Sequence, residues 1–395
     1  MVNLQGLRFV AACDIMSERL GRTYHMIRRL FDYKINRYLD PQQMFAEEDA
    51  IDAVIVATPD FWHTPHAVMA LEAGCHVYCE TMMSNNLEGA RAILQAAEQS
   101  GELCQIGYHR RSHPVYRYEF EQLLHRHDLF GHIMRVEAQR FRSIQESMDI
   151  IMKPSILPEQ DVLEQHGFKN SYEYLNWRLI PRLSSGLTSE FSSHQIDVFN
   201  WYLGTTPRKV YSAGTRSYFL ERECYDTINT LLDYQLPTGI VQAVQRVAGT
   251  SVSPHGYFEA FNGRNGSAQL SEKKAFQAIF RACGTTPETW HDLVRRGYLK
   301  YDSDTFGDIP PDPYGWDALC NETVNTRGNP FYTIPGEPNR PPHSYHLENF
   351  FESIRGEAQL NCDAKTGLAT ERVLHAMTQS SQEETAVKLE HDESA

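Results

Sequence analysis

The chain has 395 residues, of which 41% are hydrophobic, and it carries a formal net charge of −14. This length allows two domains, because one domain usually takes ~100–200 residues. The acidic balance, without an obvious basic patch, argues against nucleic acid as a partner. No apolar run approaches the ~20 residues needed to span a bilayer, so we expect no membrane partner. The eight cysteines lack C-x-x-C spacing, which favours reduced thiols in a cytoplasmic protein over disulfides or a zinc site.

The first apolar strand is predicted at residues 9–13, directly before Asp14. A dinucleotide-binding unit normally opens one strand earlier, with a G-x-G-x-x-G loop whose helix faces the pyrophosphate. We therefore expect a truncated Rossmann-like domain over residues 1–112. Either the chain is a fragment or has a misassigned start, which would also hide a signal peptide, or the phosphate loop is truly lost. In both cases two strand edges would lack a partner.

Residues 51–105 predict a βαβαβ unit that ends on a small-molecule site. A buried strand at 52–57 runs into Pro59, which interrupts regular structure. A helix that ends at Gly74 follows, and the next strand lies at 76–80. Parallel strands of this kind bind ligands at their carboxyl ends, where residues 58–63 and 80–82 lie.

The pattern changes after residue 112 to that of an α+β domain over residues 113–395. A helix is expected at 113–127 and a strand at 133–139. The polar and aromatic segment 141–183 has no clear period, and we interpret it as an irregular lid or site wall.

Later strands suggest an open, mainly antiparallel sheet with helices on one face, through which we expect a homo-oligomer to form. These strands are predicted at 208–213, 227–234, 240–247 and 256–261. Residues 273–342 show no period and are interpreted as an elaborated insertion. Two helices follow at 343–354 and 365–377, and we expect the second to pack back on the first domain.

His194 is the candidate general base. Oxidation of a carbinol requires a base for the hydroxyl proton while hydride leaves the carbon, and histidine titrates near neutral pH. Glu190 lies one helical turn before His194 and Asp197 nearly one turn after it, so all three can project from one helix face. Glu190 could orient the imidazole or hold a sugar hydroxyl. The alternative is a polar, solvated helix start, where an acid is favoured by the helix dipole.

Together these motifs resemble the Gfo/Idh/MocA family of NAD(P)-dependent sugar and polyol oxidoreductases. The resemblance rests on residues 9–14, 57–63, 74–80, 105–111 and 190–197. It implies an α/β N-terminal Rossmann-like domain, incomplete here, plus an α+β C-terminal domain. It also implies NAD as the cofactor and a small-molecule carbohydrate or polyol as the substrate.

Residues 80–82 depart from the Glu-Lys-Pro ending that is usual in that family, because Thr81 stands where the lysine is expected. The lysine cation favours alkoxide character in the substrate, which threonine cannot do. Thr81 can still hydrogen-bond the substrate or the cofactor amide. The implied catalytic residues are His194, Glu190 and Thr81, with help from Tyr108 or His109.

The resemblance further implies two sets of binding residues, while the lack of metal-ligand spacing in the sequence predicts no metal site. The cofactor-binding set is Asp14, Thr58, Pro59, Trp62, His63, Glu80, Thr81 and His109. The substrate-binding set is Arg111, Trp177, Arg178, Glu190, His194 and Asp197. Asp14 favours NAD over NADP, because its carboxylate would repel a 2′-phosphate.

Several of these residues have structural alternatives. Trp62 and His63 could cap the first helical turn instead of lining the cleft. One of Arg110 and Arg111 could form an interdomain ion pair. Trp177 could anchor the long loop as a buried ring instead of forming a sugar platform.

The sequence therefore predicts an NAD(P)-dependent oxidoreductase that acts on a sugar, glycoside or cyclic polyol hydroxyl. Two alternatives remain open. One is a redox-neutral, NAD-using lyase or glycoside-cleaving enzyme that works through a transient keto-sugar. The other is a non-catalytic binding or scaffold protein without a working phosphate loop.

Overall fold

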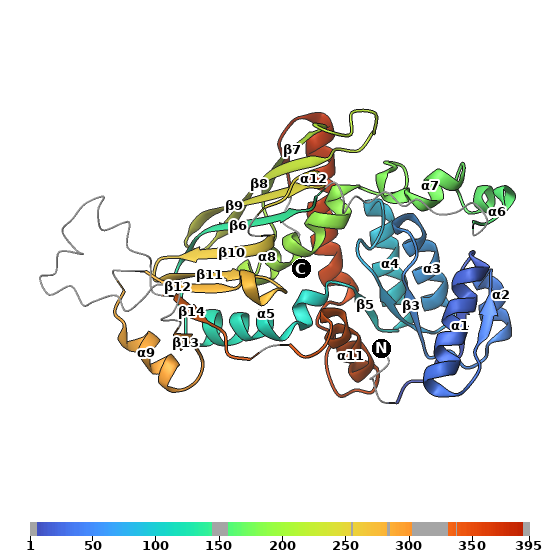
Figure 1. Ribbon diagram of the computed structural model, residues 1–395, viewed down its shortest axis with the longest axis horizontal. Coiled ribbons are helices and arrows are strands. Elements are labelled where there is room, and N and C mark those ends of the chain that lie inside the picture. Colours follow the sequence, from blue (N-terminus) through green and yellow to red (C-terminus); the bar gives the residue numbers. More distant parts are fainter. Residues whose placement is uncertain are drawn as a thin grey trace, which may run out of the picture.

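The structure is a computed structural model that describes residues 6–143, 157–253, 256–282, 285–301, 331–336 and 338–389. It has two halves, with the first strands and helices on the right of Figure 1 and a large sheet on the left. Helices α11 (Pro342–Ile354) and α12 (Ala364–Glu383) lie between the halves. Within the described ranges, no helix is both long and apolar enough to cross a lipid bilayer.

The N-terminal half contains two small parallel sheets. The strands are β1 (Ala11–Cys13) with β2 (Asn36–Tyr38), and β3 (Ala53–Val56), β4 (His76–Cys79) and β5 (Cys104–Ile106). The helices are α1 (Ser17–Phe31), α2 (Pro41–Glu47), α3 (Asp60–Glu72) and α4 (Leu87–Ser100). Among the described residues, β1 pairs with β2 alone and β3 with β4 alone. This agrees with the expectation that two strand edges lack a partner.

Local signals explain where these helices begin and end. The Asn86 side chain accepts a hydrogen bond of 2.8 Å from the Gly89 N–H at the start of α4. That helix ends at Gly101, whose φ of 75° is open to glycine without strain. At the start of α2, Asp40 accepts from the Gln42 N–H, and Pro41 occupies the first turn.

The C-terminal half is built on a sheet of ten strands in the order β13-β14-β12-β11-β10-β6-β9-β8-β7-β15. The strands are β6 (Ile133–Phe141), β7 (Lys209–Thr215), β8 (Thr227–Leu236), β9 (Gly239–Ala248), β10 (Tyr257–Gly263), β11 (Gly266–Leu270), β12 (Ala278–Arg281), β13 (Lys300–Tyr301), β14 (Phe331–Thr333) and β15 (Val387–Lys388). β6 and β9 pair in parallel, and the other neighbouring strands pair antiparallel. The prediction of an open, mainly antiparallel sheet is confirmed.

The helices between β5 and α11 are mostly short. They are η1 (His109–Ser112), α5 (Pro114–Tyr118), η2 (Glu119–Arg126), α6 (Gln160–Gln165), α7 (Ser171–Leu175), η5 (Trp177–Leu179), η6 (Thr188–Ser192), α8 (Ser193–Leu203), η7 (Lys274–Phe276) and α9 (Glu288–Arg295). η2 and η6 are π-helices, and η1, η5 and η7 are 3-10 helices.

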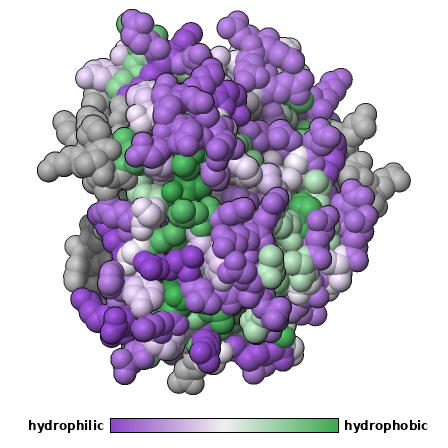
Figure 2. All heavy atoms as spheres, turned by 90° about the vertical axis from the view of Figure 1, so that its right-hand side faces the viewer, coloured by the Kyte–Doolittle hydropathy of each residue, from purple (hydrophilic) through white to green (hydrophobic). Residues whose placement is uncertain are grey.

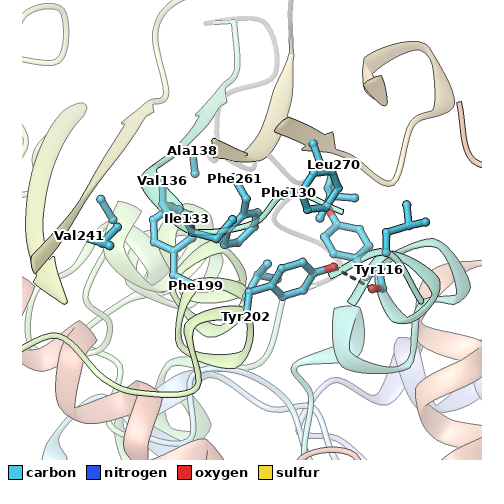
Figure 3. Close-up of a cluster of buried hydrophobic side chains, with 14 of the residues drawn as sticks. Tyr116, Phe130, Ile133, Val136, Ala138, Phe199, Tyr202, Val241, Phe261 and Leu270 are labelled. Carbon is cyan, nitrogen blue, oxygen red and sulfur yellow. Dashed lines mark hydrogen bonds between the residues drawn. The ribbon is translucent and has the colours of Figure 1, made fainter. Parts of the chain in front are cut away.

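A large apolar core lies between this sheet and the helices. Figure 3 shows Val136 and Ala138 of β6 facing Phe199 and Tyr202 of α8. The buried Tyr202 hydroxyl donates a hydrogen bond of 2.7 Å to the Tyr116 carbonyl oxygen, so its polar end is satisfied inside the core. Burial of these side chains fixes which face of β6 is turned towards α8.

Three segments differ from their predicted secondary structure. The helix expected at 113–127 is an α-helix to Tyr118 and a π-helix after it. Of the segment expected to be irregular, residues 157–183 form α6, α7 and η5, because buried side chains such as Leu163 and Phe168 anchor them on Met16. Residues 144–156 lie outside the described residues. In the expected insertion, residues 302–330 also lie outside the described residues. The described residues of that insertion include α9 and the three short strands β12, β13 and β14 of the large sheet.

The two C-terminal helices connect the halves. α12 contacts α4 and β5 in the first half and α8 and β7 in the second. α11 contacts β4 and η1, and the buried Gln105 amide donates a hydrogen bond of 2.7 Å to the His346 carbonyl oxygen. The predicted packing of the last helix on the first half is therefore present.

The outer face of the N-terminal half is largely hydrophilic. Figure 2 shows this face with a band of hydrophobic side chains down its middle. Met26 and Leu30 of α1 are among the large apolar residues of the chain that stay exposed.

Candidate active site

The carboxyl ends of β3 and β4 lie at one edge of their parallel sheet, where Thr58, Pro59 and Glu80 follow. His63 connects the two ends: its Nδ1 lies 2.5 Å from the Met82 carbonyl oxygen and its Nε2 lies 2.7 Å from that of Thr58. Burial lowers the pKa of His63, and the two carbonyl oxygens oppose that shift. His63 thus fixes the loops at this edge, and its role towards a cofactor stays a prediction.

Trp62 links the same edge to the α6–α7 segment. Its indole Nε1 donates a hydrogen bond of 3.0 Å to the His166 carbonyl oxygen. Its ring stacks on His66 at 5.0 Å between centroids, and the His66 Nδ1 lies 3.2 Å from the Thr58 hydroxyl. The first turn of α3 is therefore held from both sides.

Asp14 follows β1 as predicted. Its Oδ1 accepts a hydrogen bond of 2.8 Å from the Met16 N–H, and Arg19 Nη1 lies 3.9 Å from its Oδ2. Burial raises the pKa of this carboxyl, while the Met16 N–H and the Arg19 cation oppose the rise. The carboxylate is only half-buried, and its oxygens can still accept hydrogen bonds from hydroxyl groups.

Trp177 packs in a buried cluster with Met16 and is only 8% exposed. This placement agrees with the alternative in which Trp177 is a buried ring that anchors the long loop. The Arg178 guanidinium lies 4.1 Å from the centre of the Trp177 ring, and its Nε donates a hydrogen bond of 2.5 Å to Glu190 Oε1. The Glu190 carboxylate is therefore engaged with an arginine, and no described contact joins it to His194.

His194 lies at the centre of the site, where the two halves meet. Its ring centroid is 4.4 Å from that of His109 and 6.0 Å from that of Tyr108. Its Nδ1 is buried and has no hydrogen-bond partner among the described residues. Burial holds the pKa of His194 well below its ordinary value, and the positive charges of His109, Arg110 and Arg140 add to the effect. The result is a neutral imidazole with a free nitrogen, as a general base requires.

Glu272 is a site residue that the sequence analysis missed. Its Oε1 lies 3.4 Å from His109 Nε2 and accepts a hydrogen bond of 3.0 Å from Arg110 Nε. Arg110 also forms a buried ion pair with Glu259. Burial raises the pKa of Glu272, but the contacts with His109 and Arg110 outweigh it and hold that pKa well below the usual range. In the sequence Glu272 is only an acid shortly after a strand, and nothing there indicates a contact with His109, which lies 163 positions away.

Arg111 and Asp197 are brought together, but as partners of each other. The guanidinium Nε and Nη2 donate to the carboxylate over 2.8 Å each, and the Thr370 hydroxyl donates to Asp197 Oδ1 at 3.1 Å. Asp197 is fully buried. His194 and Asp197 lie in α8, whereas Glu190 lies in the π-helical turn before it, and the described ion-pair partners of Glu190 and Asp197 are arginines and not His194.

The loop after β4 is held by α12. Glu371 Oε1 accepts hydrogen bonds of 2.8 Å from the Met83 N–H and from the Tyr108 hydroxyl. Burial raises the pKa of Glu371 to about 8. Thr81 in this loop is partly buried and follows Glu80, whose pKa burial raises against the nearby His109 charge.

Asp60 is a second buried acid that the sequence analysis did not single out. The hydroxyls of Ser184 and Ser189 donate to its Oδ2 over 2.8 Å and 2.7 Å. Burial raises the pKa of Asp60 to about 7, although these hydrogen bonds oppose the rise. The N-terminus of α3 is thereby tied to the segment that leads into α8.

The chemistry of the residues at the strand ends is compatible with a dinucleotide. Asp14 follows β1, where an acid can accept hydrogen bonds from ribose hydroxyls, and Thr58 and Glu80 follow β3 and β4. No G-x-G-x-x-G loop occurs in the described part of the chain. Across the same residues, no group of three or more His, Cys, Asp and Glu side chains could hold a metal ion.

Comparison with known proteins identifies the family. Residues 2–108 match the family model for the oxidoreductase family with an NAD-binding Rossmann fold, and residues 161–389 match the model for the C-terminal alpha/beta domain of that family. A scyllo-inositol 2-dehydrogenase (NADP(+)) of Bacillus subtilis is 24% identical over 350 residues, which are 87% of this chain and 80% of that protein. A D-glucoside 3-dehydrogenase of Escherichia coli is 33% identical over 105 residues, 27% of this chain and 28% of the relative.

The chain spans 25% to 42% of the length of the first four curated relatives it matches. Its fold is that of a myo-inositol 2-dehydrogenase from Lactobacillus plantarum, with a TM-score of 0.65 and 16% identity over 98% of this chain and 93% of the other. The chain therefore belongs to the Gfo/Idh/MocA oxidoreductase family, with an NAD-binding Rossmann-type domain and a C-terminal alpha/beta domain.

Proposed function

We propose that this protein oxidises a hydroxyl group of a sugar, glycoside or cyclic polyol, with NAD as the hydride acceptor. The observation that carries the proposal is His194, a neutral, buried imidazole whose Nδ1 has no partner among the described residues. The similarity to proteins named as inositol and glucoside dehydrogenases supports the substrate class.

His194 accepts the hydroxyl proton of the substrate. NAD, when bound, takes up the hydride from the carbon that carried that hydroxyl. His109 lies beside His194 and faces Glu272, and the side chains of His109 and Glu272 are 18% and 21% exposed. The two imidazoles and the carboxylate thus offer the proton a route from the buried base towards solvent.

Asp14, Thr58 and Glu80 would hold the cofactor, together with Pro59, Trp62, His63, Thr81 and His109. Asp14 favours NAD, because a carboxylate at the end of β1 would repel a 2′-phosphate. Arg111, Trp177, Arg178, Glu190 and Asp197 would shape the substrate side, with Arg178 and Glu190 as the partly exposed pair among them.

We also propose a domain boundary after residue 112, at the end of η1. We further propose that the protein forms a homo-oligomer through the open face of the large sheet. Tyr211, Leu231 and Ile240 are exposed strand residues that support this contact. A cytoplasmic location is supported by the free thiols of the six described cysteines.

The test is a substrate panel of glucosides, aldoses and inositols with the purified chain. We expect NADH to form with at least one panel member in the presence of NAD. Aglycone release without added NAD would favour the redox-neutral alternative. If the protein neither turns over any member nor binds NADH in a calorimetric titration, the dehydrogenase proposal is wrong and the scaffold alternative is favoured.

A further inference from the structure

Arg140 of β6 and Arg142, the residue after the end of that strand, face the same side as the core residues of β6. Successive side chains of a strand alternate between its faces, so Val136, Ala138, Arg140 and Arg142 share one face. Val136 and Ala138 pack on α8 in the core (Figure 3). The arginines therefore continue this line towards the segment that precedes His194.

Both guanidinium groups gather on Phe191, in the turn before His194. Their central carbons lie 5.0 Å and 5.1 Å from the ring centre, for Arg140 and Arg142 respectively. Arg140 is also close enough to His194 for its charge to lower the pKa of that imidazole. The pair thus forms part of the wall around the candidate base.

The other arginines around the site have carboxylate partners. Arg110 pairs with Glu259 and Glu272, Arg111 pairs with Asp197, and Arg178 pairs with Glu190. Within each ion pair the two opposite charges offset each other, so these pairs add little net charge to the surroundings of His194.

Arg140 and Arg142 differ from them. Arg140 Nη1 donates a hydrogen bond of 2.8 Å to a neutral acceptor, the Glu190 carbonyl oxygen. In the part of the chain that the structure describes, neither arginine forms an ion pair with a carboxylate. Burial lowers the pKa of Arg140 to about 10; the positive charges of Arg110 and Arg142 add to this shift, and the carboxylates of Glu190 and Glu272 oppose it. Two arginines without a direct carboxylate partner among the described residues therefore stand around Phe191, in the turn before His194.

We propose that Arg140 and Arg142 form an anion subsite and that the substrate is an anionic sugar, with a carboxylate or phosphate group next to the hydroxyl-bearing ring. Paired guanidinium forks match the oxygen geometry of both groups, and an anion would compensate the buried positive charge. This inference rests on the proposed function, since it assigns the substrate of that same site.

Binding measurements test the subsite without turnover. Calorimetric titrations compare glucose with glucuronate as the carboxylate arm and with glucose 6-phosphate as the phosphate arm. We expect the protein to bind one of the two anions at least about tenfold more tightly than glucose, and added salt to weaken that binding. The arm that gains affinity identifies the anionic group.

Arg140→Gln and Arg142→Gln should each remove most of that gain, about tenfold in Kd, and should leave glucose binding unchanged. Arg142→Lys keeps the charge without the fork and should give an intermediate Kd. The matched control is Arg135→Gln, because Arg135 lies on the opposite face of β6, 61% exposed and paired with Glu137. Thermal melting curves show whether each variant is folded.

Equal affinity of the wild type for glucose and both anions would overturn the proposal. So would folded Arg140→Gln and Arg142→Gln variants that bind the preferred anion as tightly as the wild type. Anion binding without any NADH formation would count against the dehydrogenase function while leaving the subsite in place. Oxidation of neutral sugars without a preference for anions would support the dehydrogenase function and contradict the anion subsite.

Discussion

The imidazole rings of His109 and His194 lie with their centroids 4.4 Å apart, one ring from each half of the molecule. Positive charge on His109 disfavours protonation of His194, and Glu272 faces His109 from the other side. The pair is therefore asymmetric, with an inner ring that stays neutral and an outer ring next to a carboxylate. Substitutions in this pair, and in the groups that hold it, should separate proton transfer from structural support.

Replacement of His194 with alanine should lower turnover by roughly 10²–10⁴-fold, the usual scale for a general acid–base group. Cofactor affinity should change little, because the described contacts of His194 are with His109 and Tyr108. Steady-state kinetics and a separate NADH titration check the two parts. An unchanged rate would remove His194 from the mechanism.

Glu272→Gln should lower kcat/KM about tenfold and move the acid limb of the rate–pH profile to lower pH. The carboxylate of Glu272 raises the pKa of His194, so its neutralisation leaves the base unprotonated at lower pH. Glu272→Asp keeps the charge and serves as the conservative control. A lower rate with an unmoved acid limb would mean that Glu272 supports the structure only.

Thr81→Lys tests whether the departure from the family pattern is accidental. We expect the new ammonium to impair activity, since it must be desolvated in a loop near His109 without a designed partner. Both proteins are compared on glucosides, other glycosides and inositols, with NADH formation and aglycone release followed together. Faster NADH formation by the variant, without aglycone release by either protein, would contradict this expectation.

Glu371→Gln should remove a pH dependence of stability. Burial raises the pKa of Glu371 from 4.5 to about 8, so the unfolded state ionises first and the free energy of unfolding falls as pH rises through this window. A tenfold change in an acid dissociation constant corresponds to about 1.4 kcal/mol. Glutamine keeps the acceptor for Met83 and Tyr108 but does not titrate, so the variant should melt higher than the wild type at alkaline pH.

Melting temperatures measured across this pH range decide the matter. Glu88→Gln, at an exposed position of α4, provides the control. If wild type and Glu371→Gln show the same pH dependence, the pKa of Glu371 does not differ between the folded and unfolded states, and the expectation is wrong.

The sequence predicted those parts of the fold that depend on local signals. β3, α3 and β4 follow from an apolar run interrupted by Pro59 and from Gly74 at the helix end. The helices in residues 157–183 were missed because their apolar residues form one cluster only when the chain brings them onto Met16. Their spacing along the sequence shows no period.

The candidate site was predictable only in part. His194 and His109 stood out because their residue types and neighbours resemble a known pattern. Glu371 could not be found in this way, since its hydrogen bond to Tyr108 spans 263 residues and a lone acid in a helix carries no sign of its partner. The π-helical turn that holds Glu190 was likewise not predicted, because the sequence spacing assumed a regular helix from Glu190 to Asp197.

The position of Glu371 in α12 affects the order in which this protein can mature. A chain emerges from the ribosome with its N-terminal residues first, and domains generally begin to fold as they appear. The Met83 N–H and the Tyr108 hydroxyl, both in the first half, find their acceptor only when α12 has been synthesised. The nascent first half can thus form its strands and helices early, but the loop around Thr81 acquires its final anchor among the last steps of translation.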